Sequence, residues 1–218
     1  MFGGYNPHMQ STEKLRRGSL FVIAAPSGAG KTSLVNEVRT RDPSLRVSVS
    51  HTTRKQRPTE VPGRDYNFVS VEEFKRLKEA GEFLEHAQVF DNFYGTGRAQ
   101  VEALRNAGHD VILEIDWQGA QQVRKALPDC KTVFILPPSR VELETRLRNR
   151  NTDSDEVIAR RLQDAVTDMS HNAEFDYVVV NDDFETSVAQ LLAILRGGGT
   201  EYGAKRADLA PLLADLLA

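Results

Sequence analysis

The chain has 218 residues, with 28 Lys and Arg against 31 Asp and Glu, so its formal net charge is −3. This balance excludes a protein that binds nucleic acid through a general excess of positive charge, and any anion site must be local. Hydrophobic residues make up 40% and charged residues 27%, which excludes a chain that is disordered throughout. The length fits one domain with inserts.

The cysteine content and the apolar runs bear on the compartment. The single cysteine, Cys130, excludes an internal disulfide and fits a reducing compartment. Because it precedes an apolar run, we expect a buried structural thiol rather than a nucleophile. The longest apolar run, residues 20–26, is far shorter than a bilayer span and continues into a glycine turn. We therefore expect a cytoplasmic protein with no membrane contact.

Apolar strands alternate with helices along most of the chain. The strands are expected at 19–24, 46–49, 83–90, 111–115, 131–136 and 177–180. The helices are expected at about 31–41, 71–80, 100–107, 118–127, 141–150, 156–169 and 186–195. This alternation predicts an α/β fold with a mainly parallel sheet covered by helices on both faces. Ligands of such sheets bind at the carboxyl ends of the strands.

Four segments stand outside this alternation. Residues 1–17 are polar and rich in glycine, and we expect a flexible arm. Residues 50–96 are expected to form an insert with its own small β structure. Three consecutive glycines at 197–199 indicate a linker, and 204–217 is expected to be a terminal helix. Leucines on one side of that helix would serve either packing or contact with a second copy of the chain.

A glycine-rich turn follows the first strand and precedes the first helix. Its residues are Ala25, Pro26, Ser27, Gly28, Ala29, Gly30, Lys31 and Thr32. They match the phosphate-loop pattern G-x-x-x-x-G-K-[ST] except that Ala25 replaces the first glycine. The two glycines let backbone N–H groups curl around phosphate oxygens, and the following helix presents its positive end to the same anion. Lys31 would reach the β- and γ-phosphates of ATP, and the Thr32 hydroxyl would bind Mg²⁺.

A basic segment lies at the start of the insert, in SHTTRKQRPTE (50–60). Arg54 and Arg57 could together hold one phosphate group, because guanidinium groups pair with phosphate through two parallel hydrogen bonds. The phenolic groups of Tyr66 and Tyr94 could donate hydrogen bonds to the same phosphate. The insert is therefore the candidate site for a phosphorylated acceptor.

Several motifs together resemble the guanylate kinase family. They are, in chain order, the phosphate loop, SHTTRKQRPTE, GRDYNFV, EFLEHA, NFYGT, LEIDWQG, the arginine-rich segment after Leu136-Pro137-Pro138, and VVVNDD. The similarity runs from about residue 18 to 196. It implies a three-layer P-loop kinase fold with a parallel core sheet (18–49 and 97–196), a small β-containing insert that binds GMP (50–96) and a helical lid (about 139–170). Residues 197–218 would then form a linker and a C-terminal helix.

The resemblance also implies roles for residues of the insert. Ser50, Glu85 and Thr96 fall where the family reads guanine, and Arg54, Arg57, Tyr66 and Tyr94 fall where it holds the GMP phosphate. The chemistry agrees, because the Glu85 carboxylate can accept hydrogen bonds from both N1–H and N2–H₂ of guanine. Adenine would leave this carboxylate unpaired, which costs about 2–4 kcal/mol. We therefore expect a strong preference for GMP over AMP.

Two carboxylates and a set of arginines complete the predicted site. Glu114 and Asp116 are two apart at a strand end, so both can face one crevice. Of the two, Asp116 is the better candidate to contact the acceptor or hydrated Mg²⁺. Arginines that match the family's lid would stabilise the transferred phosphoryl group. These predicted catalytic residues are Arg146, Arg150 and Arg161, beside Lys31, and Asn181 would line the nucleotide base pocket.

The leading hypothesis is a kinase of purine nucleotide metabolism that transfers phosphate from MgATP to GMP, with dGMP as a further acceptor. One departure is Thr59, where the family commonly has glycine after the proline, and it affects a turn more than the chemistry. Two alternatives stay open: a kinase of a phosphorylated ribose, and a noncatalytic guanylate-kinase-like interaction module. The base-reading residues argue against the first, and Lys31, Thr32 and the lid arginines argue against the second.

Overall fold

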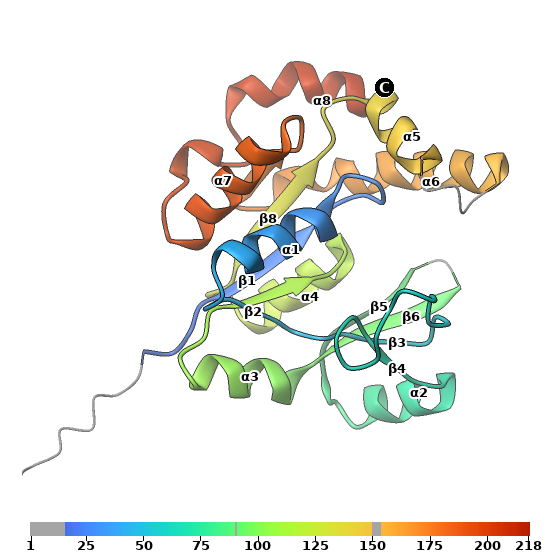
Figure 1. Ribbon diagram of the computed structural model, residues 1–218, viewed down its shortest axis with the longest axis vertical. Helices are drawn as coiled ribbons and strands as arrows, with labels where there is room; N and C mark the ends of the chain where they lie inside the picture. Colours follow the sequence, from blue (N-terminus) through green and yellow to red (C-terminus); the bar gives the residue numbers. More distant parts are fainter. Residues whose placement is uncertain (1–15, 90, 150–153) are drawn as a thin grey trace, which may run out of the picture.

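The computed structural model describes residues 16–89, 91–149 and 154–218. Its centre is a five-stranded parallel sheet with the strand order β2-β7-β1-β8-β9 (Figure 1). Every residue of β1 is buried, because helices cover both faces of the sheet. The strands are β1 (Leu20–Ala24), β2 (Arg46–Val47), β7 (Val111–Glu114), β8 (Lys131–Leu136) and β9 (Tyr177–Val180).

Helices on the two faces of this sheet make a three-layer core. On one face α1 (Lys31–Arg41) and α7 (Phe184–Leu195) pack together and bury the side chains of Leu34 and Leu191. The other face is covered by α3 (Arg98–Asn106), α4 (Trp117–Ala126), α5 (Arg140–Arg148), α6 (Asp155–Ser170) and α8 (Ala210–Leu216). The predicted three-layer α/β fold with a parallel sheet is confirmed.

A second, four-stranded sheet lies beside the core, in the lower right of Figure 1. Its strands have the order β4-β3-β6-β5, and α2 (Val71–Glu79) packs on it through a small cluster of Phe74, Leu77 and Phe83. The strands are β3 (His51–Thr52), β4 (Asn67–Phe68), β5 (Phe83–Val89) and β6 (Asn92–Gly97). The break in the sequence alternation at 50–96 thus corresponds to a separate β structure.

The predicted terminal helix at 204–217 is wrong in its extent. The helix α8 covers only Ala210–Leu216, after a 3₁₀ turn at Ala207–Leu209. The residues before it run across the end of β9, where the Ala204 N–H donates to Asp176 O, so they pair with the core instead of continuing a helix. The leucines of this segment serve packing, because Leu209 and Leu216 are buried in the main core.

Most of the predicted N-terminal arm (1–17) lies outside the described residues. Arg16 and Arg17, which are described, form ion pairs with Asp110 and Glu102. Cys130 is buried at the start of β8, as expected for a structural thiol. Of the helices in the described ranges, none has the length and apolar character needed to cross a membrane.

Candidate active site

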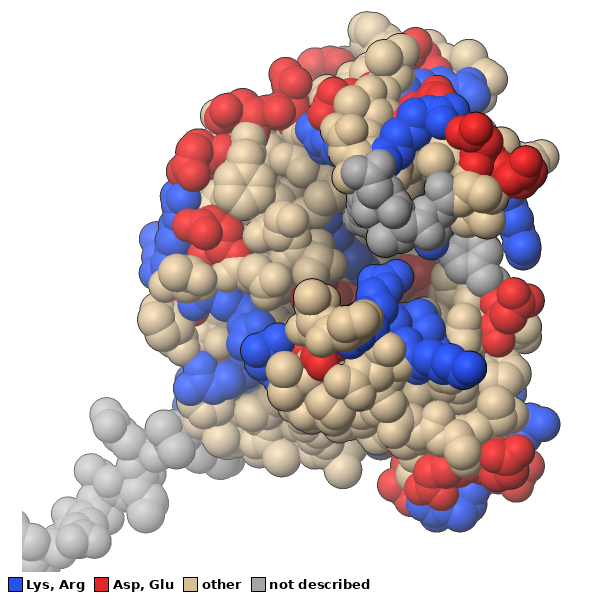
Figure 2. Space-filling view, turned by 45° about the vertical axis from the view of Figure 1, so that its right-hand side comes forward, with Lys and Arg blue, Asp and Glu red and all other residues tan. Residues whose placement is uncertain are grey.

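A hollow between the core and the insert is the candidate site, and Lys and Arg side chains gather around it (Figure 2). The carboxyl ends of β1 and β7, two neighbouring parallel strands, reach the same edge of the core sheet. The phosphate loop follows β1 and Glu114 ends β7. The chain therefore places its predicted donor and acceptor residues at the strand ends where α/β sheets bind ligands.

The phosphate loop connects β1 to α1 as a tight turn. Gly28 and Gly30 have φ values of 94° and 93°, in the left-handed region that glycine adopts without strain. Asn181, which follows β9, is buried and donates from Nδ2 to Ala29 O at 2.8 Å. A Cβ on Gly30 would lie 2.3 Å from that nitrogen, so glycine is required there twice over. Asn181 thus holds the backbone of the phosphate loop at Ala29.

Lys31, the first residue of α1, lies inside this hollow. Its Nζ donates to Ile115 O at 2.9 Å. Burial lowers the pKa of Lys31 below its ordinary value, and nearby carboxylates partly offset that effect. These carboxylates, in decreasing order of influence, are Glu114, Asp116, Asp168 and Glu85. The lysine is therefore the positive centre of an otherwise acidic group of side chains.

The two predicted carboxylates differ in local structure. Glu114 is the last residue of β7, whereas Asp116 lies beyond the strand and caps α4, accepting from the Gly119 N–H at 2.8 Å. The strand ends one residue before its predicted end at 115, although the Ile115 N–H still donates to Ile23 O of β1, and Asp116 keeps an extended backbone before the helix begins at Trp117. Burial raises the pKa of Asp116. Both carboxylates lie close enough to Lys31 for their charges to raise its pKa.

Three residues predicted to read guanine lie together in the insert. Thr96 Oγ1 donates to Glu85 Oε1 at 2.6 Å, and Ser50 Oγ lies 3.3 Å from Thr96 Oγ1. Glu85 is 3% exposed and Thr96 is fully buried. Burial raises the pKa of Glu85 to about 7, against the opposing effect of the Thr96 hydrogen bond. The site therefore has a nearly buried carboxylate with one oxygen already bonded.

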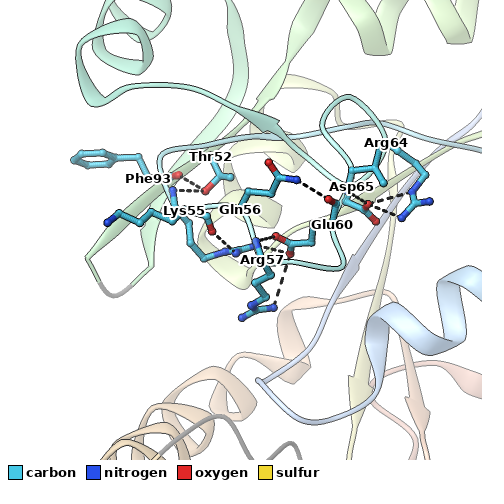
Figure 3. Close-up of polar contacts among 10 residues, drawn as sticks. Thr52, Lys55, Gln56, Arg57, Glu60, Arg64, Asp65 and Phe93 are labelled. Atoms are coloured by element: carbon cyan, nitrogen blue, oxygen red, sulfur yellow. Dashed lines mark hydrogen bonds and ion pairs between the residues drawn. The ribbon is translucent and has the colours of Figure 1, made fainter.

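The predicted phosphate-holding residues lie on the loop before β4 and on β6. Arg54 Nη2 donates to Glu60 Oε1 at 2.6 Å, and its guanidinium lies over the Tyr66 ring at 5.4 Å. The Glu60 carboxylate also accepts from the Arg57 N–H at 2.8 Å (Figure 3). The Arg57 guanidinium lies 3.9 Å from Glu60 Oε1, and the arginine side chain is 60% exposed (Figure 3). Glu60 therefore fixes the loop that carries both arginines.

Tyr66 and Tyr94 complete this group. Their rings meet edge to face, with centroids 6.0 Å apart. Burial raises the pKa of Tyr66 to about 12, with Tyr94 and Glu114 adding to the shift. The Tyr66 phenol therefore keeps its proton at neutral pH and is available as a hydrogen-bond donor.

Two of the predicted lid arginines are described: Arg161 on α6 bonds the phosphate loop, and Arg146 on α5 bonds Asn181, the residue that contacts the loop. Arg146 donates from Nε to Glu142 Oε1 at 2.7 Å and from Nη2 to Asn181 O at 3.0 Å. Arg161 Nη1 donates to Ser27 Oγ at 3.4 Å. The third predicted arginine, Arg150, lies outside the described residues.

Sequence reasoning missed Asp168 on α6. Its Oδ1 accepts from Trp117 Nε1 at 3.1 Å, which ties α6 to the start of α4. Burial raises its pKa to about 6, and Asp116 adds to the shift. One signal was available, because Arg161 and Asp168 are seven residues apart and so share a face of one helix.

The match to a known family decides which kind of protein this arrangement belongs to. A family model described as guanylate kinase matches residues 17–197, most of the chain. The chain belongs to the guanylate kinase family. The resemblance seen in its motifs is therefore confirmed, and neither alternative, the ribose phosphate kinase or the noncatalytic module, is favoured.

Individual relatives agree with this family assignment. The chain is 54% identical over 203 residues to a guanylate kinase of Methylococcus capsulatus, covering 93% of this chain and 100% of that protein. It is 48% identical over 206 residues to a guanylate kinase of Escherichia coli K12, covering 94% and 100%. The crystal structure of guanylate kinase from Anaplasma phagocytophilum is similar with a TM-score of 0.71 at 36% identity, covering 91% of this chain and 94% of that one.

Proposed function

We propose that this chain, a nucleoside monophosphate kinase by family, transfers the γ-phosphate of MgATP to GMP and yields ADP and GDP. The observation that carries the proposal is the buried Glu85 carboxylate, which accepts from Thr96 and lies against Gly119 near the start of α4. This helix follows Ile115, whose carbonyl accepts from Lys31. A buried carboxylate needs hydrogen-bond donors, and guanine supplies two on one edge. dGMP carries the same base and is expected to be an acceptor as well.

Guanine would be read by the group of Glu85, Thr96 and Ser50. Thr96 occupies one oxygen of Glu85 and fixes the carboxylate plane. The carboxylate would accept from N1–H and N2–H₂, and Ser50 would donate to O6. Adenine lacks the N2 amine and has an acceptor at N1, so its binding would leave Glu85 without donors. Such a mismatch costs about 1–3 kcal/mol or more.

The GMP phosphate would be held by the four side chains of the basic loop and β6. Arg54 is already fixed by Glu60, so little conformational entropy is lost when it binds. Arg57 is exposed and would turn onto the same phosphate. Tyr66 and Tyr94 would donate from their phenols.

The donor nucleotide would bind at the phosphate loop, residues 25–32. Lys31 would leave Ile115 O for the phosphate oxygens, and Arg146, Arg150 and Arg161 would stabilise charge that develops on the transferred group. Asn181 supports the loop from below, and its predicted contact with the nucleotide base belongs to the same proposal.

The residues present fit Mg²⁺ bound with ATP. The described residues contain no group of three or more His, Cys, Asp or Glu that could hold a metal by themselves. Mg²⁺ commonly takes one or two protein oxygens plus substrate phosphates and water. Thr32 would supply such an oxygen, and Asp116 and Glu114 would accept hydrogen bonds from water bound to the ion. When bound, the ion neutralises phosphate charge.

The protein's own part in the reaction is positioning and charge stabilisation. A GMP phosphate oxygen would attack the γ-phosphorus in line, so no covalent intermediate on the protein is needed. Arginines on α5 and α6 would cover the transferred group and exclude water, which would otherwise hydrolyse ATP. We place this reaction in the cytoplasm.

The test is ADP production from MgATP with GMP, dGMP, AMP, UMP and ribose phosphates offered separately. Turnover with GMP and dGMP, and little with AMP, is the expected result. Turnover with a ribose phosphate instead would overturn the proposed acceptor. A folded protein that uses no acceptor would overturn the proposed enzymatic activity.

A further inference from the structure

The edge of the insert sheet contains an unusual contact with the core. β5 is an edge strand in the order β4-β3-β6-β5, so alternate backbone groups along its outer side have no partner in that sheet. At His86 both groups are bonded to one side chain of α4. The His86 N–H donates to Gln122 Oε1 at 3.1 Å, and Gln122 Nε2 donates to His86 O at 2.7 Å.

This contact adjoins the proposed base reader. His86 directly follows Glu85 in β5, so fixing the His86 backbone fixes the origin of the Glu85 side chain. On the other side, Glu85 Oε2 lies 2.6 Å from where a Cβ on Gly119 would be. Gly119 and Gln122 are three residues apart on α4 and share a face. The same face of one core helix thus meets the Glu85 carboxylate and the backbone of the next residue, His86.

The helix α4 also begins close to the residue that Lys31 contacts. Ile115, whose carbonyl accepts from Lys31 Nζ, lies two residues before the first residue of α4. In Figure 1, α4 lies between the core sheet and the insert, and its packing against β5 is extensive. One rigid helix therefore connects the position of the lysine to the position of Glu85.

Apolar packing also joins β5 to the core, because Leu84 of β5 is buried in the main core cluster with Ala120 and Val123 of α4. The insert's own cluster joins β5 to α2 rather than to α4. The polar bonds of Gln122 are directional, whereas apolar packing is not. They can therefore set the register of the edge strand against the core.

We propose that Gln122 is a positioning residue for guanine recognition, since its amide bonds both backbone groups of His86 and so places Glu85 at the right distance from the phosphate loop. The inference rests on the proposed function, in which Glu85 reads the base. Gln122 itself touches neither substrate.

The test compares Gln122→Met with Gln121→Met. Methionine keeps the length of the side chain but loses both hydrogen bonds to His86. Gln121 is the adjacent residue on α4, is exposed, and bonds Glu174 on the side away from β5, so its replacement is a matched control. Steady-state kinetics with GMP, AMP and MgATP, together with the midpoint of thermal unfolding, give the readouts.

With Gln122→Met, the strand that carries Glu85 loses two bonds that hold its position. The KM for GMP is therefore expected to rise about tenfold, and the preference for GMP over AMP to fall by a similar factor. The kcat and the KM for MgATP should stay within about twofold. Gln121→Met should leave all four values near those of the parent. A lower unfolding midpoint with an unchanged KM for GMP, or equal loss for every substrate, would overturn the inference.

Two further variants keep the test decisive. In Gly119→Ala the added methyl group displaces the Glu85 carboxylate, while the bonds of Gln122 remain. This variant should therefore also raise the KM for GMP, even if Gln122→Met folds poorly. An unchanged KM for GMP would contradict the inference. Glu85→Gln distinguishes failure of the inference about Gln122 from failure of the proposed base-reading role of Glu85. If it loses GMP preference while Gln122→Met and Gly119→Ala retain it, the inference alone fails. If Glu85→Gln retains GMP preference, the proposed base-reading role fails.

Discussion

The phosphate loop takes its residues from one stretch of eight, whereas the residues around Glu85 come from three segments of a small second sheet. The loop would bind phosphate through backbone N–H groups, and two left-handed glycines and the start of α1 supply its geometry. The base-reading group uses side chains of Ser50, Glu85 and Thr96, which are linked only after β5 and β6 have paired.

The difference teaches where each site is vulnerable. A backbone site is disturbed by changes to its glycines, to its lysine or to the side chain beneath it. A side-chain site is disturbed by changes in the packing that sets the distance between its members. The loop is embedded between extensively buried layers, whereas the insert contributes a much smaller apolar cluster of its own. We therefore expect substitutions to separate donor chemistry from acceptor selectivity.

The largest expected effect is the loss of turnover in Lys31→Ala. The lysine supplies the positive charge nearest the transferred phosphate, and loss of one such group lowers kcat by about 10²- to 10³-fold or more. GMP affinity should change little, because the acceptor binds on the insert. ADP release and calorimetric GMP titration measure the two properties. Equal loss of both would show that the two regions are not separable at this residue.

Next in size is the effect of Glu85→Gln on acceptor selectivity. The amide would present an N–H₂ group to the donors of guanine, and kcat/KM for GMP should fall by about 10²- to 10³-fold, which corresponds to about 3–4 kcal/mol. MgATP affinity should stay unchanged. Glu82→Gln, at an exposed position just before β5, is the control. If Glu85→Gln keeps its preference for GMP over AMP, the prediction is contradicted.

A third effect is the pH dependence of GMP binding. Burial raises the pKa of Glu85 to about 7, and the proposed contact needs the carboxylate, so affinity should weaken about tenfold per pH unit below pH 7. The effect of pH on the stability of the folded chain has the opposite sign. The raised pKa stabilises the folded chain most below the ordinary pKa of a glutamic acid, and this contribution is lost as pH rises through about 7.

Calorimetric GMP titrations from pH 5.5 to 8.5 would measure this binding effect. The GMP phosphate also titrates in part of that range, so Glu85→Gln serves as the reference. The contribution of Glu85 is the difference between the two proteins in the slope of GMP affinity against pH. Identical slopes would contradict the prediction.

The smallest expected effect is that of Asn181→Ala. The variant leaves the Ala29 carbonyl without its buried donor, which lowers the free energy of unfolding by about 1–3 kcal/mol. MgATP affinity should fall severalfold because the loop loses its support, and GMP affinity should not change. Thermal unfolding and separate titrations of the two nucleotides check this, with the exposed Asp182→Ala as control. An equal loss of GMP affinity would mean that the loop and the insert are coupled.

The alternation of elements and the phosphate loop could be predicted because both are local. Apart from α8, the helices and strands of the core lie close to their predicted ranges, since apolar periodicity reports burial on a sheet. The base-reading group was predicted through the family resemblance, and the structure brings its members together. Their action on GMP stays a prediction.

Other features depend on contacts between distant segments and could not be derived from any local pattern. Asn181 meets Ala29 across 152 residues, and Gln122 meets His86 across 36. Neither separation has a periodicity from which the contact could be derived. The pairing of Arg54 with Glu60 is short in sequence, yet its role in holding the loop is visible only with the ring of Tyr66 beside it.

The sequence by itself determined the anion-binding turn, because two glycines, a lysine and the start of a helix fix that geometry within a few residues. It also determined the layered fold through its alternation of apolar strands and amphipathic helices. Only the tertiary structure decided that the C-terminal segment turns across β9, and that α4 links Lys31 to Glu85. The physical reason is that hydrogen bonds between elements depend on how those elements pack, and packing is a property of the whole fold.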